Sequence, residues 1–155
     1  MKRLVAPLAL VALGIAVAVP ARAAPAATSA SIVIRHQVKG CHTWSLNRGP
    51  YRAMLETRVA RGGSITITNN DPMVHKLIQL SGQPVAIQHT ADHHMTRMGL
   101  KHITGRGVMN HMEASIRVTF LKAGIHRFTT EDLGDYFDLN STGGHNHLML
   151  VVRVS

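Results

Sequence analysis

Short stretches in which β-branched and other apolar residues alternate with polar ones recur along the chain, and turn residues separate them. A period of two is typical of strands with one buried face, and no segment keeps the 3.6-residue period of an amphipathic helix. The sequence therefore predicts an all-β fold, a two-sheet antiparallel Greek-key β-sandwich. The predicted strands are residues 31–38, 55–59, 64–69, 75–80, 84–88, 114–120, 125–130 and 147–154.

Between these strands the pattern predicts one tight turn and one long connection. Arg61-Gly62-Gly63 is the expected turn between the second and third strands. Residues 89–111 contain three glycines and keep no period, so we expect an irregular connection that bears histidines and methionines. The segment 41–45 is left without a predicted strand.

The amino-terminal residues follow a different pattern. Met1-Lys2-Arg3 precedes an apolar run, which ends at Pro20 and the small-residue sequence Ala21-Arg22-Ala23. This is typical of a secretory signal peptide, and the run is too short for a membrane span. We expect cleavage after Ala23, a flexible lead at 24–30 and a single domain over 31–155. The mature protein would then be secreted or periplasmic, without a membrane span.

The charge of the mature chain narrows the choice of partner. Without Lys2, Arg3 and Arg22, 14 basic residues stand against 8 acidic ones, a net charge of +6 with histidines neutral. No run of four basic residues occurs, so nucleic acid is a poor candidate. A basic surface can instead steer the protein toward an acidic partner, such as a redox or copper-handling protein, or toward an anionic membrane surface.

The chain is rich in histidine and methionine, which can bind metals, and poor in cysteine. The chain has eleven histidines and one cysteine, Cys41, and seven methionines remain after Met1 is removed. A single cysteine cannot make an internal disulfide in an oxidising compartment. Imidazole, thiolate and thioether are together the donor set that suits copper. Composition therefore favours copper as the cofactor.

Two motifs carry a resemblance to a known family. The strand 64–69 runs into Asn69-Asn70-Asp71-Pro72, and His75 follows where the next strand begins. The segment 118–130 contains a strand, an Ala-Gly turn and a strand that bears an aromatic residue. The pair resembles cupredoxins, the small β-sandwiches that hold a single copper ion. The resemblance implies that His75 is the first histidine ligand at one end of the sandwich.

The sequence departs from the cupredoxin pattern after the hairpin. In typical cupredoxins that hairpin ends in a cysteine, which a histidine and usually a methionine follow. Here the corresponding position is Thr130, and residues 131–138 contain none of these ligands. The usual ligand loop is missing, so a blue-copper electron-transfer site is not carried over as it stands.

Topology offers other ligands at the same end. If the strands at 31–38, 55–59 and 64–69 run up, down and up, Cys41 and His42 lie near His75. Neighbouring side chains in a regular strand point to opposite faces, so one of Cys41 and His42 would bind and the other support it. The closing strand begins at the same end, and a loop methionine before Gly99 could supply a soft ligand. The predicted metal ligands are His75, Cys41, His42, His145, His147 and Met98.

The leading hypothesis is a secreted or periplasmic copper-binding protein that carries copper or transfers one electron, and the sequence does not decide between these roles. The first alternative is an enzyme whose copper keeps an open coordination position. The second is a metal-free β-sandwich that acts as an interaction module, which the missing cysteine loop favours. No catalytic residues are predicted.

Overall fold

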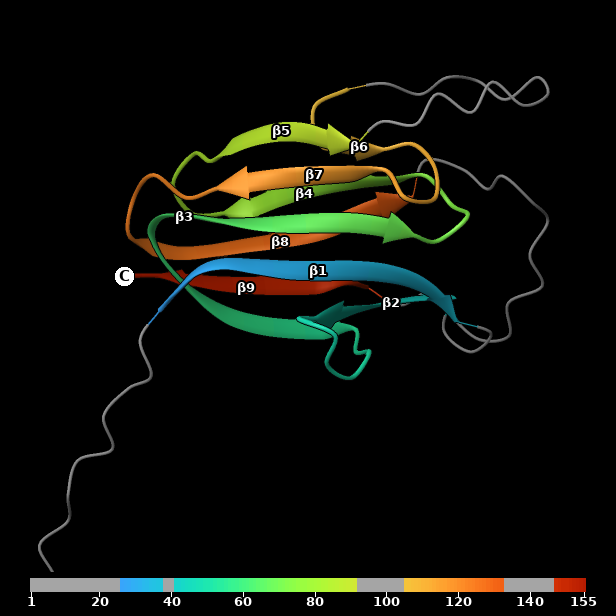
Figure 1. Ribbon diagram of the computed structural model, residues 1–155, viewed down its shortest axis with the longest axis horizontal. Helices are drawn as coiled ribbons and strands as arrows, with labels where there is room; N and C mark the ends of the chain where they lie inside the picture. Colours follow the sequence, from blue (N-terminus) through green and yellow to red (C-terminus); the bar gives the residue numbers. More distant parts are fainter. Residues whose placement is uncertain (1–25, 38–40, 92–104, 133–146) are drawn as a thin grey trace, which may run out of the picture.

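The computed structural model describes residues 26–37, 41–91, 105–132 and 147–155 (Figure 1). In these ranges the chain forms β-strands and no helix, which confirms the predicted all-β sandwich. None of the described segments is a helix long and apolar enough to cross a membrane. The predicted leader at 1–23 lies outside the described residues. The strands are β1 (Ala27–Gln37), β2 (Cys41–Leu46), β3 (Met54–Asn70), β4 (His75–Ser81), β5 (Ala86–Ala91), β6 (Val108–Met109), β7 (Ser115–Thr119), β8 (Gly124–Asp132) and β9 (Met149–Val154).

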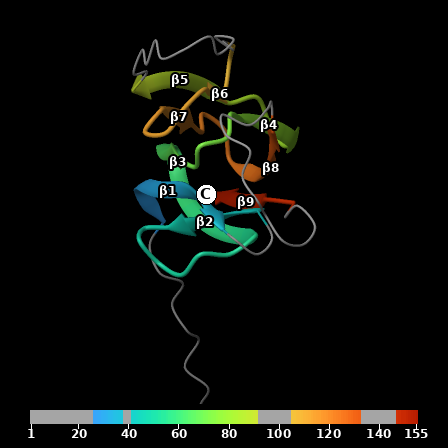
Figure 2. The same ribbon diagram turned by 90° about the vertical axis from the view of Figure 1, so that its right-hand side faces the viewer.

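The long strand β3 takes part in both layers of the sandwich. Its second part pairs with β1 and β7, so that one layer has the order β2-β1-β3-β7-β5. Its first part pairs with β9, and the other layer continues through β8 and β4 to β6. Figure 2 shows the two layers side by side. The predicted antiparallel pairing needs a correction, because β3 is parallel to both β1 and β9.

The predicted turn at residues 61–63 is a bend inside β3 instead of a hairpin between two strands. The bend reverses the direction of the chain between the two parts of β3 (Figure 1), as the up-down-up prediction requires. Gly62 adopts a φ of 80°. A Cβ on Gly63 would lie 2.7 Å from the Thr28 carbonyl oxygen and 2.6 Å from Val59 Cγ1. The two glycines therefore let the strand pass from one layer to the other.

The strand β2 was missed by the sequence pattern. It pairs antiparallel with β1 and presents His42 and Trp44 to the interior, where each is almost completely buried. The Trp44 Nε1–H donates to the Ala53 carbonyl at 3.1 Å, which satisfies the indole in the core. The apolar alternation that marks a strand is hidden here, because a histidine occupies an inward position.

The core lies between the layers and is formed by alternate residues of the strands. In β1 the inward positions are Ile32, Ile34 and then His36, so the apolar face becomes polar toward the end of the strand. The β4, β2 and β9 strands begin at this same end, where β1, β3 and β8 finish (Figure 1). Polar residues at these strand ends therefore lie together at one end of a sandwich whose core is otherwise apolar.

Candidate metal centre

The link between β3 and β4 is fixed by a buried asparagine. Asn69 is fully buried, and its Nδ2 donates to the Met73 carbonyl at 2.8 Å and to the Met109 carbonyl at 3.3 Å. Its Oδ1 accepts the Asp71 N–H at 2.9 Å. Because the side chain uses both its donor and its acceptor groups, it holds the link against β6 in one conformation.

A second local hydrogen bond directs the carboxylate of Asp71. Its Oδ1 accepts the Met73 N–H at 2.9 Å, two residues further along the chain. Asn and Asp commonly bond to the backbone two residues on and so specify a turn. Two such bonds follow one another here, at Asn69 and at Asp71. The Asn-Asn-Asp-Pro sequence therefore places Asp71 inside the protein, just before His75.

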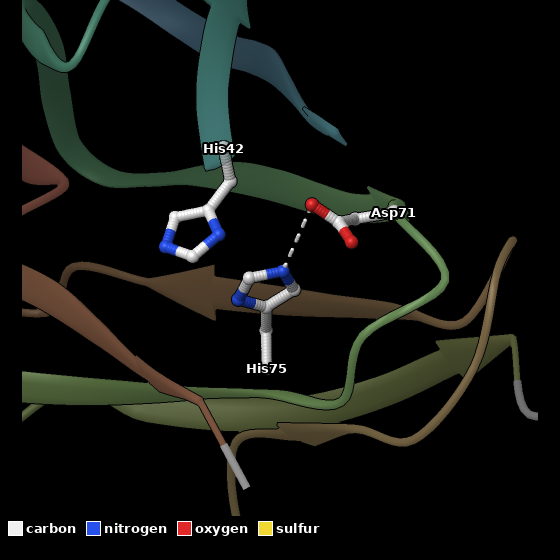
Figure 3. A group of neighbouring side chains, drawn as sticks. All are labelled: His42, Asp71 and His75. Carbon is white, nitrogen blue, oxygen red and sulfur yellow. Dashed lines mark ion pairs between the residues drawn. The ribbon is translucent and has the colours of Figure 1, made fainter. Parts of the chain in front are cut away.

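Three buried side chains meet at this end of the sandwich (Figure 3). His42 comes from β2, Asp71 from the link just after β3, and His75 from the start of β4; their exposed fractions are 3%, 0% and 0%. The His75 Nε2 lies 3.5 Å from the Asp71 Oδ2. The two imidazole rings meet edge to face, with centroids 5.1 Å apart. One ligand atom from each residue lies within 4.8 Å of the others.

The donor set of this cluster fits a transition-metal ion. Two imidazoles and a carboxylate converge from both layers in a place with little contact with water. Imidazole binds copper and zinc well, and a carboxylate near a ligating histidine commonly orients its ring. The separation of 3.5 Å is longer than a strong hydrogen bond, and the carboxylate of Asp71 faces the Nε2 of His75 across this gap.

Strand register places two further donors beside the cluster. His36 lies directly opposite His42 in the β1–β2 pair, and Met109 lies directly opposite His75 in the β4–β6 pair. Directly opposed residues of antiparallel strands share one face. Met109 is fully buried, and the Nδ1 of His36 is buried without a hydrogen-bond partner among the described residues. A third imidazole and a thioether therefore flank the cluster.

No protein-family model and no curated protein sequence matches the chain. Solved structures with a similar arrangement include a purple cupredoxin from Nitrosopumilus maritimus, which is 15% identical over 81% of this chain and 98% of that chain, with a TM-score of 0.39. A multicopper oxidase is 13% identical over 85% of this chain and 45% of that chain, with a TM-score of 0.44. An inclusion body protein from Burkholderia cenocepacia is 10% identical over 86% of this chain and 98% of that chain, with a TM-score of 0.34. These are weak similarities in fold, and no argument about function rests on them.

Of the predicted ligands, the structure brings His42 and His75 together. His147 is exposed and does not belong to the buried cluster. Cys41 is the first residue of β2 and adjoins His42 in sequence, but its side chain lies outside what the structure describes. Met98 and His145 fall outside the described residues.

Sequence reasoning treated Asp71 only as part of a turn, and it left His36 and Met109 without a role at this site. A signal for Asp71 was present, since a carboxylate four residues before a strand-initiating histidine can reach its ring. The other two could not be found this way, because they come beside the histidines only through strand pairing.

Proposed function

We propose that this is a cupredoxin-like copper-binding protein, which holds one copper ion between His42 and His75 at the end of the sandwich. The observation that supports this most is the buried cluster of two histidines and an aspartate. A metal ion there would join the two layers, because β2 belongs to one and β4 to the other. Bound copper supplies a centre that can change between Cu(I) and Cu(II).

Each side chain of the cluster has its own role in this proposal. His42 and His75 are the ligands, and the Asp71 carboxylate, which faces the Nε2 of His75, holds that ring in place. We therefore assign the Nδ1 of His75 to the metal. Cys41 is proposed as a further, thiolate ligand because it is the first residue of β2, where the strict alternation of a regular strand ends. A thiolate beside imidazoles would give a type-1-like site.

The role of the copper follows from the burial of the cluster. Catalysis on a substrate needs an open coordination position that the substrate can reach. All three side chains are at least 97% buried, which favours carriage of copper or one-electron transfer over an enzyme. We propose that the predicted leader directs the protein out of the cytoplasm, and that its basic surface suits an acidic redox or copper-handling partner.

The proposal is tested by adding Cu(II) to the mature chain and to single variants, and by measuring affinity and visible absorption. We expect one copper per chain, bound tightly by the wild type and weakly by His42→Ala and His75→Ala. His89→Ala is the matched control, because His89 lies in β5 outside the cluster. Binding that survives both cluster variants would contradict the proposal, because the copper would then lie elsewhere. A wild type that binds no copper would favour the metal-free module.

Two further variants separate the roles of the neighbouring residues. Cys41→Ser should remove an intense thiolate-to-copper absorption band, and a wild-type spectrum without that band would show that Cys41 is not a ligand. Asp71→Asn keeps an oxygen that can accept the Met73 N–H but loses the charge that faces His75. We expect it to weaken copper binding by about 10- to 100-fold, as losing a supporting group commonly does.

A further inference from the structure

A second set of soft donors lies on the outer face of the layer that contains β9. The first residue of β3, Met54, is paired with the first residue of β9, Met149, in parallel register. The first part of β3 and β9 are neighbouring strands (Figure 1), and their pairing brings the two methionines, which are far apart in sequence, side by side. Paired residues of neighbouring strands present their side chains on the same face of the sheet.

Burial shows that this face is the outer one. Met54 is 67% exposed, the largest exposed fraction among the large apolar side chains of the described residues. In the closing segment the buried residues are Leu148 and Leu150, while Met149 between them is only partly buried. His147 is exposed and lies two residues before Met149, just before β9 begins, so its imidazole is on the surface close to Met149.

This group is unlike the rest of the outer face of β3 and β9. Further along the same two strands, the outward positions hold Glu56, Arg58, Val151 and Arg153, none of which is a soft metal ligand. An exposed methionine side chain adds little hydrophobic stabilisation to the fold. Two thioethers beside an imidazole, however, form a donor set that selects Cu(I). The unbranched, flexible side chain of methionine allows both sulfur atoms to turn toward one ion.

We propose that Met54, Met149 and His147 form an accessible site for a soft monovalent ion such as Cu(I). The site is separate from the buried cluster, since it lies on the outer face while His42 and His75 point into the core. It does not depend on copper binding by the buried histidines. An exposed site of this kind can exchange its ion with solution or with a partner protein more readily than a buried one.

The test uses Ag(I), a soft monovalent ion that does not change oxidation state, and the mature chain with ¹³C-labelled methionine methyl groups. We expect the methyl signals of Met54 and Met149 to shift together and to saturate at one equivalent of silver. Met112 is the internal control, because it is 49% exposed but lies outside this group. Independent shifts at higher silver concentration, or shifts that Met112 shares, would overturn the proposal as adventitious binding, as would shifts confined to other methionines.

Single variants then assign the ligands. Met54→Leu and Met149→Leu nearly conserve side-chain volume and should each weaken silver binding by about tenfold or more. Met112→Leu should leave it unchanged, and so should His75→Ala in protein that remains folded, because His75 lies in the buried cluster and not on the outer face. Equal affinity in wild type, Met54→Leu and Met149→Leu would refute the outer site. Loss of silver binding in His75→Ala would show that the ion occupies the buried cluster instead.

Discussion

The two ends of the sandwich each contain a completely buried histidine, and their surroundings differ. At one end His75 meets a second imidazole and a carboxylate. At the other end His126 packs between aromatic rings, with the ring of Phe120 edge-on at 5.1 Å and the ring of Phe128 parallel at 6.5 Å. Its Nε2 lies 3.4 Å from the Lys122 carbonyl oxygen. Burial of a histidine therefore does not by itself indicate a metal site, and the neighbouring donor groups make the difference.

The largest expected effects distinguish the two ends by the free energy of unfolding and by copper binding. Phe128→Ala removes a buried ring from the apolar end and should lower the free energy of unfolding by about 3–5 kcal/mol, while the folded protein still binds copper. His75→Ala should instead abolish the stabilisation by copper, which for the wild type is about 2.7 kcal/mol when free copper is 100 times Kd. Denaturant unfolding with and without copper measures both. A Phe128→Ala variant that folds but no longer binds copper would contradict this difference between the two ends.

A smaller effect should come from the asparagine that fixes the link before His75. Asn69→Ala leaves the buried Asp71 N–H and the Met73 carbonyl without this side chain, and should destabilise the protein by about 1–3 kcal/mol. It should also weaken copper binding by about 10- to 100-fold, because the carboxylate and the histidine lose their fixed positions.

The matched control for this variant is Asn70→Ala, since Asn70 is the exposed neighbour of Asn69. We expect it to change stability by no more than about 0.5 kcal/mol and copper affinity not at all. Calorimetric titration with Cu(II) compares the two variants. Equal losses of affinity in both would mean that the link is not held by the buried amide.

The smallest expected effect concerns the carboxylate of Glu56, which is exposed, unlike the buried carboxylate of Asp71. A hydrogen bond from Arg153, helped by the charge of that guanidinium, lowers the pKa of Glu56 below its usual value. A lowered pKa in the folded state means that the pair adds stability above the pKa of the unfolded chain and loses it as pH falls through the folded pKa. Exposed pairs contribute little, so Glu56→Gln should lower the urea midpoint slightly at pH 7 and not at all in strong acid. A larger difference in acid than at pH 7 would reverse this sign.

The sequence predicted the sandwich and the approach of His42 to His75 from strand alternation and from the position of turn residues. Those signals are local. The directions of successive strands were then enough to predict that His42 and His75 lie at the same end of the sandwich. The parallel pairing of β3 with β1 and β9 was missed because no local pattern records which strands become neighbours. The bend at Gly63 was read as a hairpin turn, although a close approach of the Thr28 backbone explains the glycine equally well.

The polar network was harder to predict than the fold. Asn69 and Asp71 belong to a turn signal, and the same residues serve equally well in an exposed turn. Their burial depends on the segment that contains β6, whose Met109 carbonyl accepts from Asn69. The pairing of Met54 with Met149 likewise joins two strands that show no relation in sequence.

The central claim is that the copper ion lies between His42 and His75, and counting the imidazoles bound to Cu(II) tests it most directly. Pulsed EPR on the mature chain with ¹⁵N-labelled histidine should detect two coordinated imidazoles in the wild type and one in His42→Ala, measured at a copper concentration that still loads the variant. His126→Leu, at the opposite end, should retain both. A count that is the same in wild type, His42→Ala and His75→Ala would contradict the account.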